Sequence, residues 1–164
     1  MIKLFIEKGS FAMGGGKSVM HIKGNLLFNG STSIAKGSRI IVGKNRTLEF
    51  GNNVSLNANS IVNACNSIYL GDNFLGGWNI TIIDGDGHII KNLSGSEVTN
   101  IPKPIRIGNQ CWVAAYATIL KGVSLSNNTI IPYGRIVYKS CDSSNVIFGG
   151  NPNRVIKHGI DWSM

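Results

Sequence analysis

The sequence predicts an all-β solenoid with three sides per coil, and three observations support this fold class. The chain has 164 residues, of which 21 are Gly and, counted along the printed sequence, 19 are Asn. Both residue types disfavour helix interiors and tolerate positive φ, so long helices and helical bundles are disfavoured. Hydrophobic residues make up 43% of the chain, and many of them recur every six positions. This length fits one domain.

The six-residue repeat is unbroken between residues 107 and 137, and it runs upstream in three further phases. The aliphatic or aromatic anchors are Ile107, Val113, Ile119, Leu125, Ile131 and Val137, then Ile22, Phe28, Ile34 and Ile40, then Phe50, Leu56, Val62 and Ile68, then Leu70, Gly76 and Ile82. Six is neither a helical nor a heptad period, but an even number returns each repeat to the same face of a strand. The alternative, a β-sandwich, shows turn signals about every 8–12 residues instead.

Asn or Gly three positions after most anchors predicts a corner in each repeat. These residues are Asn25, Gly37, Asn53, Asn59, Asn73, Asn79, Gly85, Gly122, Asn128 and Gly134, with Ser31, Cys65, Gln110 and Tyr116 as exceptions. A left-handed residue at one fixed point per repeat bends a short strand through a corner. Three such sides per turn stack into a prism whose interior the anchors fill.

Residues 22–137 are predicted to form this solenoid, with three departures from the repeat. Residues 1–21 carry no clear repeat and are expected to form an N-terminal extension. Residues 89–104 are polar, contain two Pro and interrupt the repeats, which predicts a loop that protrudes from the prism. Residues 138–164 leave the rhythm and are expected to cap the open end of the solenoid, which otherwise exposes unpaired backbone.

His88 is the main candidate for chemistry, because it stands between a repeat and the predicted loop. Asp84 and Asp86 precede it at even spacing. In an extended segment all three side chains point to one side, so either carboxylate can orient the imidazole. An imidazole exchanges protons near neutral pH and suits proton abstraction from a hydroxyl that attacks an acyl thioester. The alternative is a turn histidine without a catalytic role.

Three local stretches add to the repeats and carry a resemblance to a known family. They are Asp84-Gly-Asp-Gly-His88, Lys103-Pro-Ile-Arg-Ile-Gly-Asn-Gln-Cys-Trp-Val113 and Gly149-Gly-Asn-Pro-Asn-Arg-Val-Ile156. Over roughly residues 22–157 the chain resembles the hexapeptide-repeat acyltransferases, and among them the sugar and polysaccharide O-acetyltransferases. The resemblance implies a left-handed parallel β-helix, His88 as general base, and a homotrimer with active sites between subunits. Many members have Pro after this His, where this chain has Ile89.

The resemblance also implies a site for acetyl-CoA as the acyl donor. Trp112 is expected on the outer surface, at a subunit interface beside the active site. Backbone groups of Ala115 and Tyr133 match those that bind the pantetheine arm, although Tyr133 stands where a small residue is common. Arg154 and Lys157 match basic residues that meet the nucleotide phosphates; a solvated basic cap is the alternative.

The acceptor side of the site is less specified by the sequence. Trp78 precedes a predicted corner and is assigned to acceptor binding, with a packed surface aromatic as the alternative. Asn92 and Lys103 of the predicted loop are expected to help hold the acceptor. Arg135 stands where a small residue is normal. Two interpretations stay open: its side chain lines the donor channel, or its position marks where the coils widen. Trp162 is expected to contact the cap.

We therefore expect an enzyme that transfers an acetyl group from acetyl-CoA to a hydroxyl of a sugar or surface-polysaccharide precursor. N-acetylation of an amino sugar is the nearest alternative, since the same base and donor site serve it. A carbonic anhydrase needs three histidines around zinc, and His21 and His158 lie at the chain ends. A non-catalytic scaffold is the alternative from another class. The net charge of +8 comes from scattered residues, which disfavours nucleic-acid binding.

The cysteines and the N-terminus indicate the compartment. The three Cys are an odd number without paired spacing, which disfavours a disulfide scaffold and a zinc site and fits a reducing cytosol. The apolar run at the N-terminus is too short and too interrupted for a signal peptide or a membrane span. A cytoplasmic protein without a metal is expected.

Overall fold

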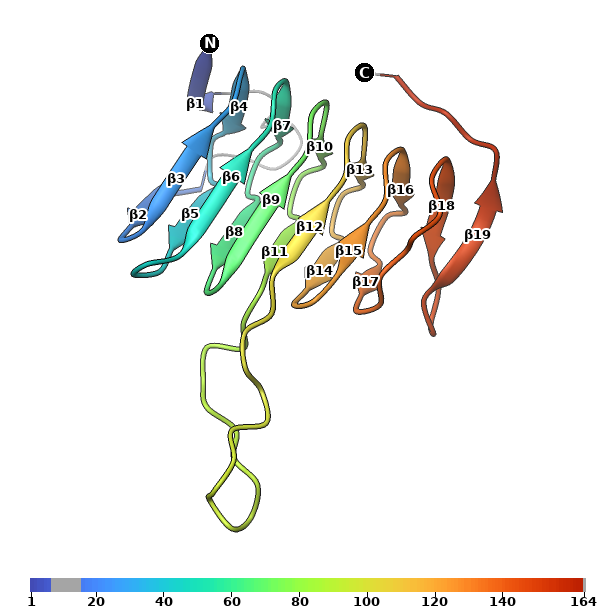
Figure 1. The fold of residues 1–164 in the computed structure, drawn as a ribbon. Coiled ribbons are helices and arrows are strands. Elements are labelled where there is room, and N and C mark those ends of the chain that lie inside the picture. Colours follow the sequence, from blue (N-terminus) through green and yellow to red (C-terminus); the bar gives the residue numbers. More distant parts are fainter. Residues whose placement is uncertain (7–15, 164) are drawn as a thin grey trace.

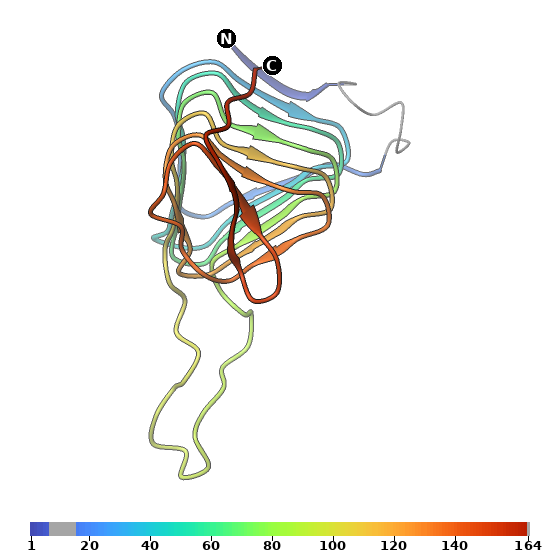
Figure 2. The ribbon, with the colours of Figure 1, turned by 90° about the vertical axis from the view of Figure 1, so that its right-hand side faces the viewer.

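A computed structural model of the chain describes residues 1–6 and 16–163, which form three β-sheets arranged as the sides of a prism (Figure 1). Viewed along the stack, successive coils lie behind one another around a common interior, and one long loop leaves the prism at a corner (Figure 2). Every described strand pairs in parallel with the strand one coil away, except the final pair, which is antiparallel. The predicted all-β solenoid is confirmed.

Successive coils give one strand to each sheet, except at the ends of the solenoid, where sheet A has additional strands. Sheet A, in spatial order, contains β1 (Ile2–Ile6), β4 (Thr32–Ala35), β7 (Val54–Leu56), β10 (Leu75–Gly76), β13 (Trp112–Val113), β16 (Thr129–Ile131), β18 (Val146–Gly149) and β19 (Arg154–His158). Sheet B contains β17 (Ile136–Val137), β14 (Thr118–Leu120), β11 (Thr81–Ile83), β8 (Ile61–Ala64), β5 (Arg39–Val42) and β2 (Val19–Ile22). Sheet C contains β15 (Ser124–Leu125), β12 (Ile105–Ile107), β9 (Ser67–Leu70), β6 (Thr47–Phe50) and β3 (Asn25–Phe28).

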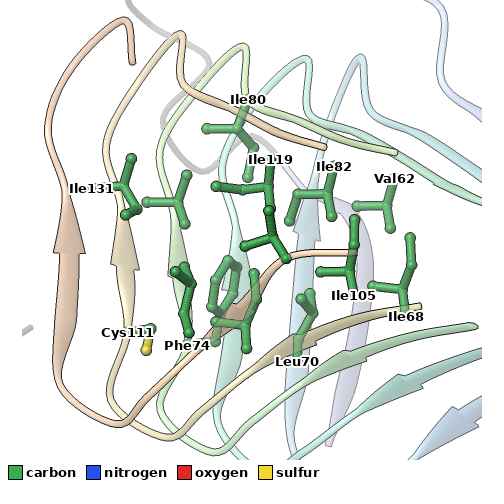
Figure 3. Close-up of a cluster of buried hydrophobic side chains, with 14 of the residues drawn as sticks. Val62, Ile68, Leu70, Phe74, Ile80, Ile82, Ile105, Cys111, Ile119 and Ile131 are labelled. Atoms are coloured by element: carbon green, nitrogen blue, oxygen red, sulfur yellow. The ribbon is translucent and has the colours of Figure 1, made fainter. Parts of the chain in front are cut away.

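The predicted anchors fill the prism (Figure 3). All six from Ile107 to Val137 are at most 3% exposed. Gly76 stands at an anchor position but has no side chain to fill the interior. A Cβ there would lie 2.6 Å from Cδ1 of Ile80. The larger neighbours thus occupy the space that an anchor side chain fills in other coils. The core is a single continuous column of apolar side chains.

Most predicted corner residues adopt the left-handed conformation. Eight do so: Gly37, Asn53, Asn59, Asn73, Asn79, Gly122, Asn128 and Gly134. Asn25 and Gly85 do not, whereas Gln110 and Tyr116, which lack the favoured residue types, have φ of 54° and 62°. The N–H of Gln110 donates to the carbonyl of Asp72 (2.7 Å), one coil away. Stacking of coils therefore imposes the corner conformation even on residues that disfavour it.

A ladder of polar side chains joins the coils at the corner between sheets C and A. The side-chain oxygen of Asn52 accepts the N–H of Ser31 (3.0 Å), and that of Asp72 accepts the N–H of Asn52 (2.7 Å). Asn109 repeats the contact with the N–H of Asp72 (2.9 Å), and Asn127 with that of Asn109 (2.8 Å). Each oxygen satisfies a backbone donor that the bend leaves unpaired. Part of the Asn excess is thus structural.

The ends of the solenoid differ from the predicted boundaries. β1 pairs with β4 and β2 with β5, so sheet structure begins within residues 1–21, where the repeat pattern is absent. At the other end, β18 continues sheet A within residues 138–164, and only β19 turns back antiparallel onto it. The six-residue repeat of apolar residues ends before the parallel pairing of strands does, because the backbone hydrogen bonds between strands do not require an apolar anchor.

Replacing Gly71 by Ala is expected to destabilise the fold by about 1–3 kcal/mol, because overpacking forces backbone shifts. A Cβ at Gly71 would lie 2.6 Å from the backbone carbonyl carbon and oxygen of Gly108 in the next coil. Gly149→Ala is the matched control, since its Cβ would meet only side-chain atoms at 3.4–3.5 Å. Urea unfolding of both variants measures the difference. Equal midpoints would contradict the close approach of the two coils.

Candidate functional site

His88 lies at the corner between sheets B and C, where the chain leaves the prism after β11 to form the long loop (Figures 1 and 2). Its side chain is exposed and borders a pocket of 340 Å³. The pocket is lined by Cys65, Asp86, Gly87, His88, Ile89, Val98, Asn100, Ile101 and Pro102. Within the described part of the chain, the imidazole makes no hydrogen bond. It is therefore open to a ligand.

Asp84 is fully buried and contacts the preceding coil, not the imidazole of His88. Its carboxylate accepts the N–H groups of Cys65 and Asn66 (2.9 Å to Asn66). Burial raises the pKa of Asp84, while these N–H bonds oppose the rise. Cys65 occupies a predicted corner position but does not have positive φ. The carboxylate of Asp84 accepts the two backbone N–H groups at this bend. The geometry gives Asp84 a structural role in place of the expected one of orienting His88.

Asp86 is also bound elsewhere, although it lines the His88 pocket. Its carboxylate forms an ion pair with Lys121 and accepts the Nδ2–H of Asn100 (3.0 Å). The ammonium of Lys121 holds the pKa of Asp86 below its ordinary value. Because both contacts involve the same oxygen, Oδ2, the carboxylate is fixed toward the next coil. In this chain it anchors the loop and makes no hydrogen bond to His88.

The two loop residues expected to hold the acceptor do not line the His88 pocket. The carboxamide of Asn92 is engaged at the loop tip, where its Oδ1 accepts the N–H groups of Ser96 (3.1 Å) and Glu97 (3.3 Å). Lys103 is exposed, and its side chain lies along Gly122 of the next coil. Their assignment to the acceptor stays a prediction.

A second concave surface lies on sheet A and its corner with sheet B. This groove of 510 Å³ is lined by Asn57, Leu75, Gly77, Trp78, Trp112, Ala114, Ala115, Ile130, Pro132, Tyr133 and Ile147. It gathers the three residues that the resemblance assigns to the donor, which are Trp112, Ala115 and Tyr133. Trp78, which is assigned to the acceptor, lines the same groove and not the His88 pocket. Most of this lining is apolar, so the groove suits a ligand with hydrocarbon segments.

Backbone donors and aromatic rings shape the groove. Among the described residues, the N–H groups of Ala115 and Tyr133 donate to no backbone oxygen. Tyr133 is 64% exposed and packs against Tyr116, with ring centroids 5.2 Å apart. Trp112 packs against Trp162 with centroids 5.9 Å apart. The indole N–H of Trp162 donates to the carbonyl of Gln110 (2.8 Å), so Trp162 contacts the solenoid at Gln110 and Trp112.

The basic residues stand at the C-terminal end of this groove. Arg154 and Lys157 lie on β19 and are exposed. Arg135 lies two residues after Tyr133, which lines the groove. Together with Gly150 and Asn151, Arg135 lines a smaller pocket of 270 Å³. A Cβ on Gly150 would lie 3.4 Å from a guanidinium nitrogen of Arg154. Arg135 and Arg154 therefore flank the same turn, where positive charge favours an anionic ligand group.

One chain does not bring the two halves of the candidate site together. His88 stands at the corner between sheets B and C, whereas Trp112 lies on sheet A, the side opposite that corner. The His88 pocket and the groove share no lining residue. Sequence reasoning missed Asn100 and Lys121 in the His88 half, because neither occupies a repeat position that marks it.

Two further findings concern metals and membranes. The described residues contain no group of three His, Cys, Asp or Glu side chains placed to hold a metal ion. His21 and His158 lie on β2 and β19, far in sequence from the loop that carries His88. No helix able to cross a membrane occurs in residues 1–6 and 16–163.

Alkylation of the native protein is expected to modify Cys65 and to leave Cys111 unreacted. Cys65 is half-exposed and lines the His88 pocket, whereas Cys111 is fully buried. Burial raises the pKa of both thiols, that of Cys111 to about 11, so labelling of Cys65 should accelerate as the pH rises. Mass spectrometry after iodoacetamide treatment at several pH values measures this. Labelling of Cys111 at the same rate in the native protein would contradict the packing.

Comparison with known proteins shows similarity to sugar acetyltransferases. No family model matches the chain. Galactoside O-acetyltransferase of Escherichia coli (strain K12) is 33% identical over 110 residues, which cover 56% of this chain and 54% of that protein. Polysialic acid O-acetyltransferase of Escherichia coli O1:K1 / APEC is 30% identical over 144 residues, which cover 88% of this chain and 44% of that protein. The chain thus spans about half the length of these curated relatives.

Solved structures extend the similarity to the fold. The polySia-specific acetyltransferase NeuO superposes with a TM-score of 0.70 at 22% identity, covering 100% of this chain and 88% of that chain. A galactoside acetyltransferase in complex with coenzyme A gives a TM-score of 0.59 at 25% identity, covering 87% of this chain and 64% of that chain.

These similarities bear on the fold of the chain and on the family that it resembles. The chain is a left-handed parallel β-helix built from hexapeptide repeats, as its sequence predicts. The resemblance to the hexapeptide-repeat acyltransferases, and among them to sugar O-acetyltransferases, is confirmed by the two relatives and by the galactoside acetyltransferase structure, while NeuO supports the fold.

Proposed function

We propose that this protein transfers an acetyl group from acetyl-CoA to a hydroxyl group of a sugar or surface-polysaccharide precursor. The observation that carries the proposal is the exposed imidazole of His88. It borders a pocket, makes no hydrogen bond within the described residues, and stands where the resemblance places a general base. The relatives named as O-acetyltransferases of galactosides and polysialic acid support the choice of a sugar acceptor.

The proposed reaction needs one proton carrier and no covalent enzyme intermediate. His88 removes the proton of the acceptor hydroxyl while the hydroxyl oxygen attacks the carbonyl carbon of the thioester. The C–S bond then breaks, and the imidazolium returns its proton to the departing thiolate of CoA. The products are an acetyl ester and free CoA. The neutral form of the imidazole is the one that accepts this proton.

The groove on sheet A is the proposed site for acetyl-CoA. The unpaired N–H groups of Ala115 and Tyr133 can donate to the amides of the pantetheine arm, whose hydrocarbon segments fit the apolar wall formed by Trp78 and Trp112. The phosphates would then reach Arg135, Arg154 and Lys157 at the C-terminal end. Acetyl-CoA complexes of structures with this fold support the donor.

A homotrimer is part of the proposal, because it joins the two halves of the site. Sheet B lies between the corner with His88 and the corner with the groove. Its outer face carries a half-buried row formed by Ile41, Asn63, Ile83 and Leu120, in register across four strands. Three copies related by a threefold axis beside this face would set the His88 corner of each against the groove of the next. Three of the four side chains in this row are apolar, which fits burial in such a contact.

The proposed location is the cytoplasm. The three cysteines are free in the structure, two of them buried, which is compatible with a reducing compartment.

Acceptor-dependent release of CoA tests the proposed function. Purified protein is incubated with acetyl-CoA and a panel of free sugars, nucleotide sugars, acidic oligosaccharides and amino sugars, and thiol release and product mass are recorded. An O-acetylated sugar with stoichiometric CoA is the expected result, together with binding of acetyl-CoA by calorimetry. An N-acetylated product would move the assignment to amino sugars. Absence of acetyl-CoA binding would overturn the proposal and favour a scaffold.

A further inference from the structure

We propose that Asn100 is a positioning residue that holds the backbone of His88 for catalysis, an inference that rests on the proposed function. Asn100 lies on the returning arm of the loop, hydrogen-bonded to His88 at its start, and it is only 9% exposed. Its Nδ2 donates to the carbonyl of His88 (2.6 Å) and to the carboxylate of Asp86 (3.0 Å). Its Oδ1 accepts the N–H of Ile90 (2.7 Å). One side chain thus binds three alternate residues around the proposed base.

The three hydrogen bonds of the Asn100 side chain take the place of the backbone hydrogen bonds that a neighbouring strand supplies elsewhere in the prism. At His88 the chain has left sheet B, so its backbone lacks the coil-to-coil partners of β11. The imidazole makes no hydrogen bond within the described residues, so the backbone decides where it stands. Asn100 uses both its N–H donors and one lone pair in the contact. Because it is buried, water does not readily replace them.

A second connection ties Asn100 to the solenoid. The ammonium of Lys121, which follows β14 in the next coil, donates to the backbone carbonyl of Asn100 (3.3 Å) and pairs with Asp86. The base of the loop is therefore held from the prism side by Lys121 and from the loop side by Asn100. Of these two residues, only Asn100 contacts His88 itself. A change at Asn100 should displace His88 while the Lys121–Asp86 ion pair remains.

The consequence for catalysis is a loss of rate without a loss of donor affinity. A general base must stand within hydrogen-bond reach of the proton it removes, and a shift of about 1 Å can cost about 100-fold in rate. The groove proposed for acetyl-CoA shares no lining residue with the His88 pocket. We therefore expect kcat to fall about 10- to 100-fold and the Kd for acetyl-CoA to stay unchanged.

The test uses Asn100→Asp and Asn100→Ser, which remove both N–H donors while retaining a polar side chain. Thr99→Val is the matched control, because it removes the neighbouring hydroxyl bond to the carbonyl of Ile90 (3.2 Å) and leaves the Asn100 contacts intact. Measured are kcat, KM for the acceptor, Kd for acetyl-CoA and the thermal unfolding midpoint. The expected result is a low kcat in both Asn100 variants with a wild-type Kd for acetyl-CoA, an unfolding midpoint lowered only by the lost hydrogen bonds, and near wild-type kcat in Thr99→Val.

Three outcomes would overturn the inference or its basis, and they are distinguishable. Wild-type kcat in both Asn100 variants overturns the positioning role alone. A common fall of midpoint and acetyl-CoA affinity overturns it as well, since Asn100 would then support the whole fold. A wild-type protein that binds acetyl-CoA but acetylates no acceptor overturns the proposed function. The contacts of Asn100 beside His88 are then tested by amide hydrogen exchange, which should accelerate at Ile90 in Asn100→Ser and remain slow there in Thr99→Val.

Discussion

Replacing His88 by Ala is expected to lower kcat for acetyl transfer by about 100- to 10,000-fold, the usual contribution of a positioned general base. The imidazole is the proton acceptor of the proposed reaction, and neither Asp84 nor Asp86 can replace it, because both carboxylates are hydrogen-bonded elsewhere. The measurement is acceptor-dependent CoA release at saturating substrates. Acetyl-CoA affinity should equal that of the wild type, since His88 lies outside the groove.

His21→Ala is the control for this prediction. His21 is exposed on β2, borders neither the His88 pocket nor the groove, and is in register with Ile41 of the proposed trimer face. Its removal should leave kcat unchanged in a variant whose size in solution equals that of the wild type. An undiminished rate of acceptor-dependent CoA release by His88→Ala would contradict the assignment of His88 as the general base. A rate that falls together with acetyl-CoA affinity would place His88 in donor binding instead.

Coexpression of His88→Ala with Trp112→Ala is expected to restore activity that each variant lacks alone. In the proposed trimer, a site combines His88 of one subunit with Trp112 of the next. When the two variants mix at random in equal amounts, half of the subunits keep His88 and half of their neighbours keep Trp112. About one quarter of the sites are then intact, so about a quarter of the wild-type activity should return. CoA release by the purified hybrid measures it.

The control for this experiment is His88→Ala mixed with the double variant His88→Ala/Trp112→Ala. That mixture contains no intact His88, so it should stay inactive. Size measurement in solution confirms that the chains form a trimer in both mixtures. No gain of activity in a hybrid trimer would contradict a site shared between subunits, and a monomer with full wild-type activity would contradict the trimer itself.

The fold was predictable because the repeat is local and short. The six-residue period assigns a face to each anchor, and the anchors from Ile107 to Val137 are all buried. The corners were predictable only where Gly or Asn stands at the bend. Gln110 and Tyr116 adopt the same conformation for a reason that their residue types do not reveal, since their N–H groups donate to the coil before.

The sequence predicted candidate residues for the site but not the partners that these residues have in the structure. The spacing of Asp84, Asp86 and His88 gave a shared side of an extended segment. The structure gives each carboxylate a different partner, Cys65 and Asn66 for one and Lys121 for the other. Asn100 carries no sequence signal, because its hydrogen bonds to Asp86 and His88 form only when the loop returns to its own base.

The sequence by itself determined the period, the inward face of each strand, the position of the loop and the resemblance that assigns a role to His88. Those features depend on neighbours within six residues or on a short motif. Only the tertiary structure decided which carboxylates are bound, that Asn100 holds His88, and that the two halves of the site lie at opposite edges of sheet B. The reason is that these contacts join residues of different coils or opposite ends of the loop, and stacking alone sets which of them meet.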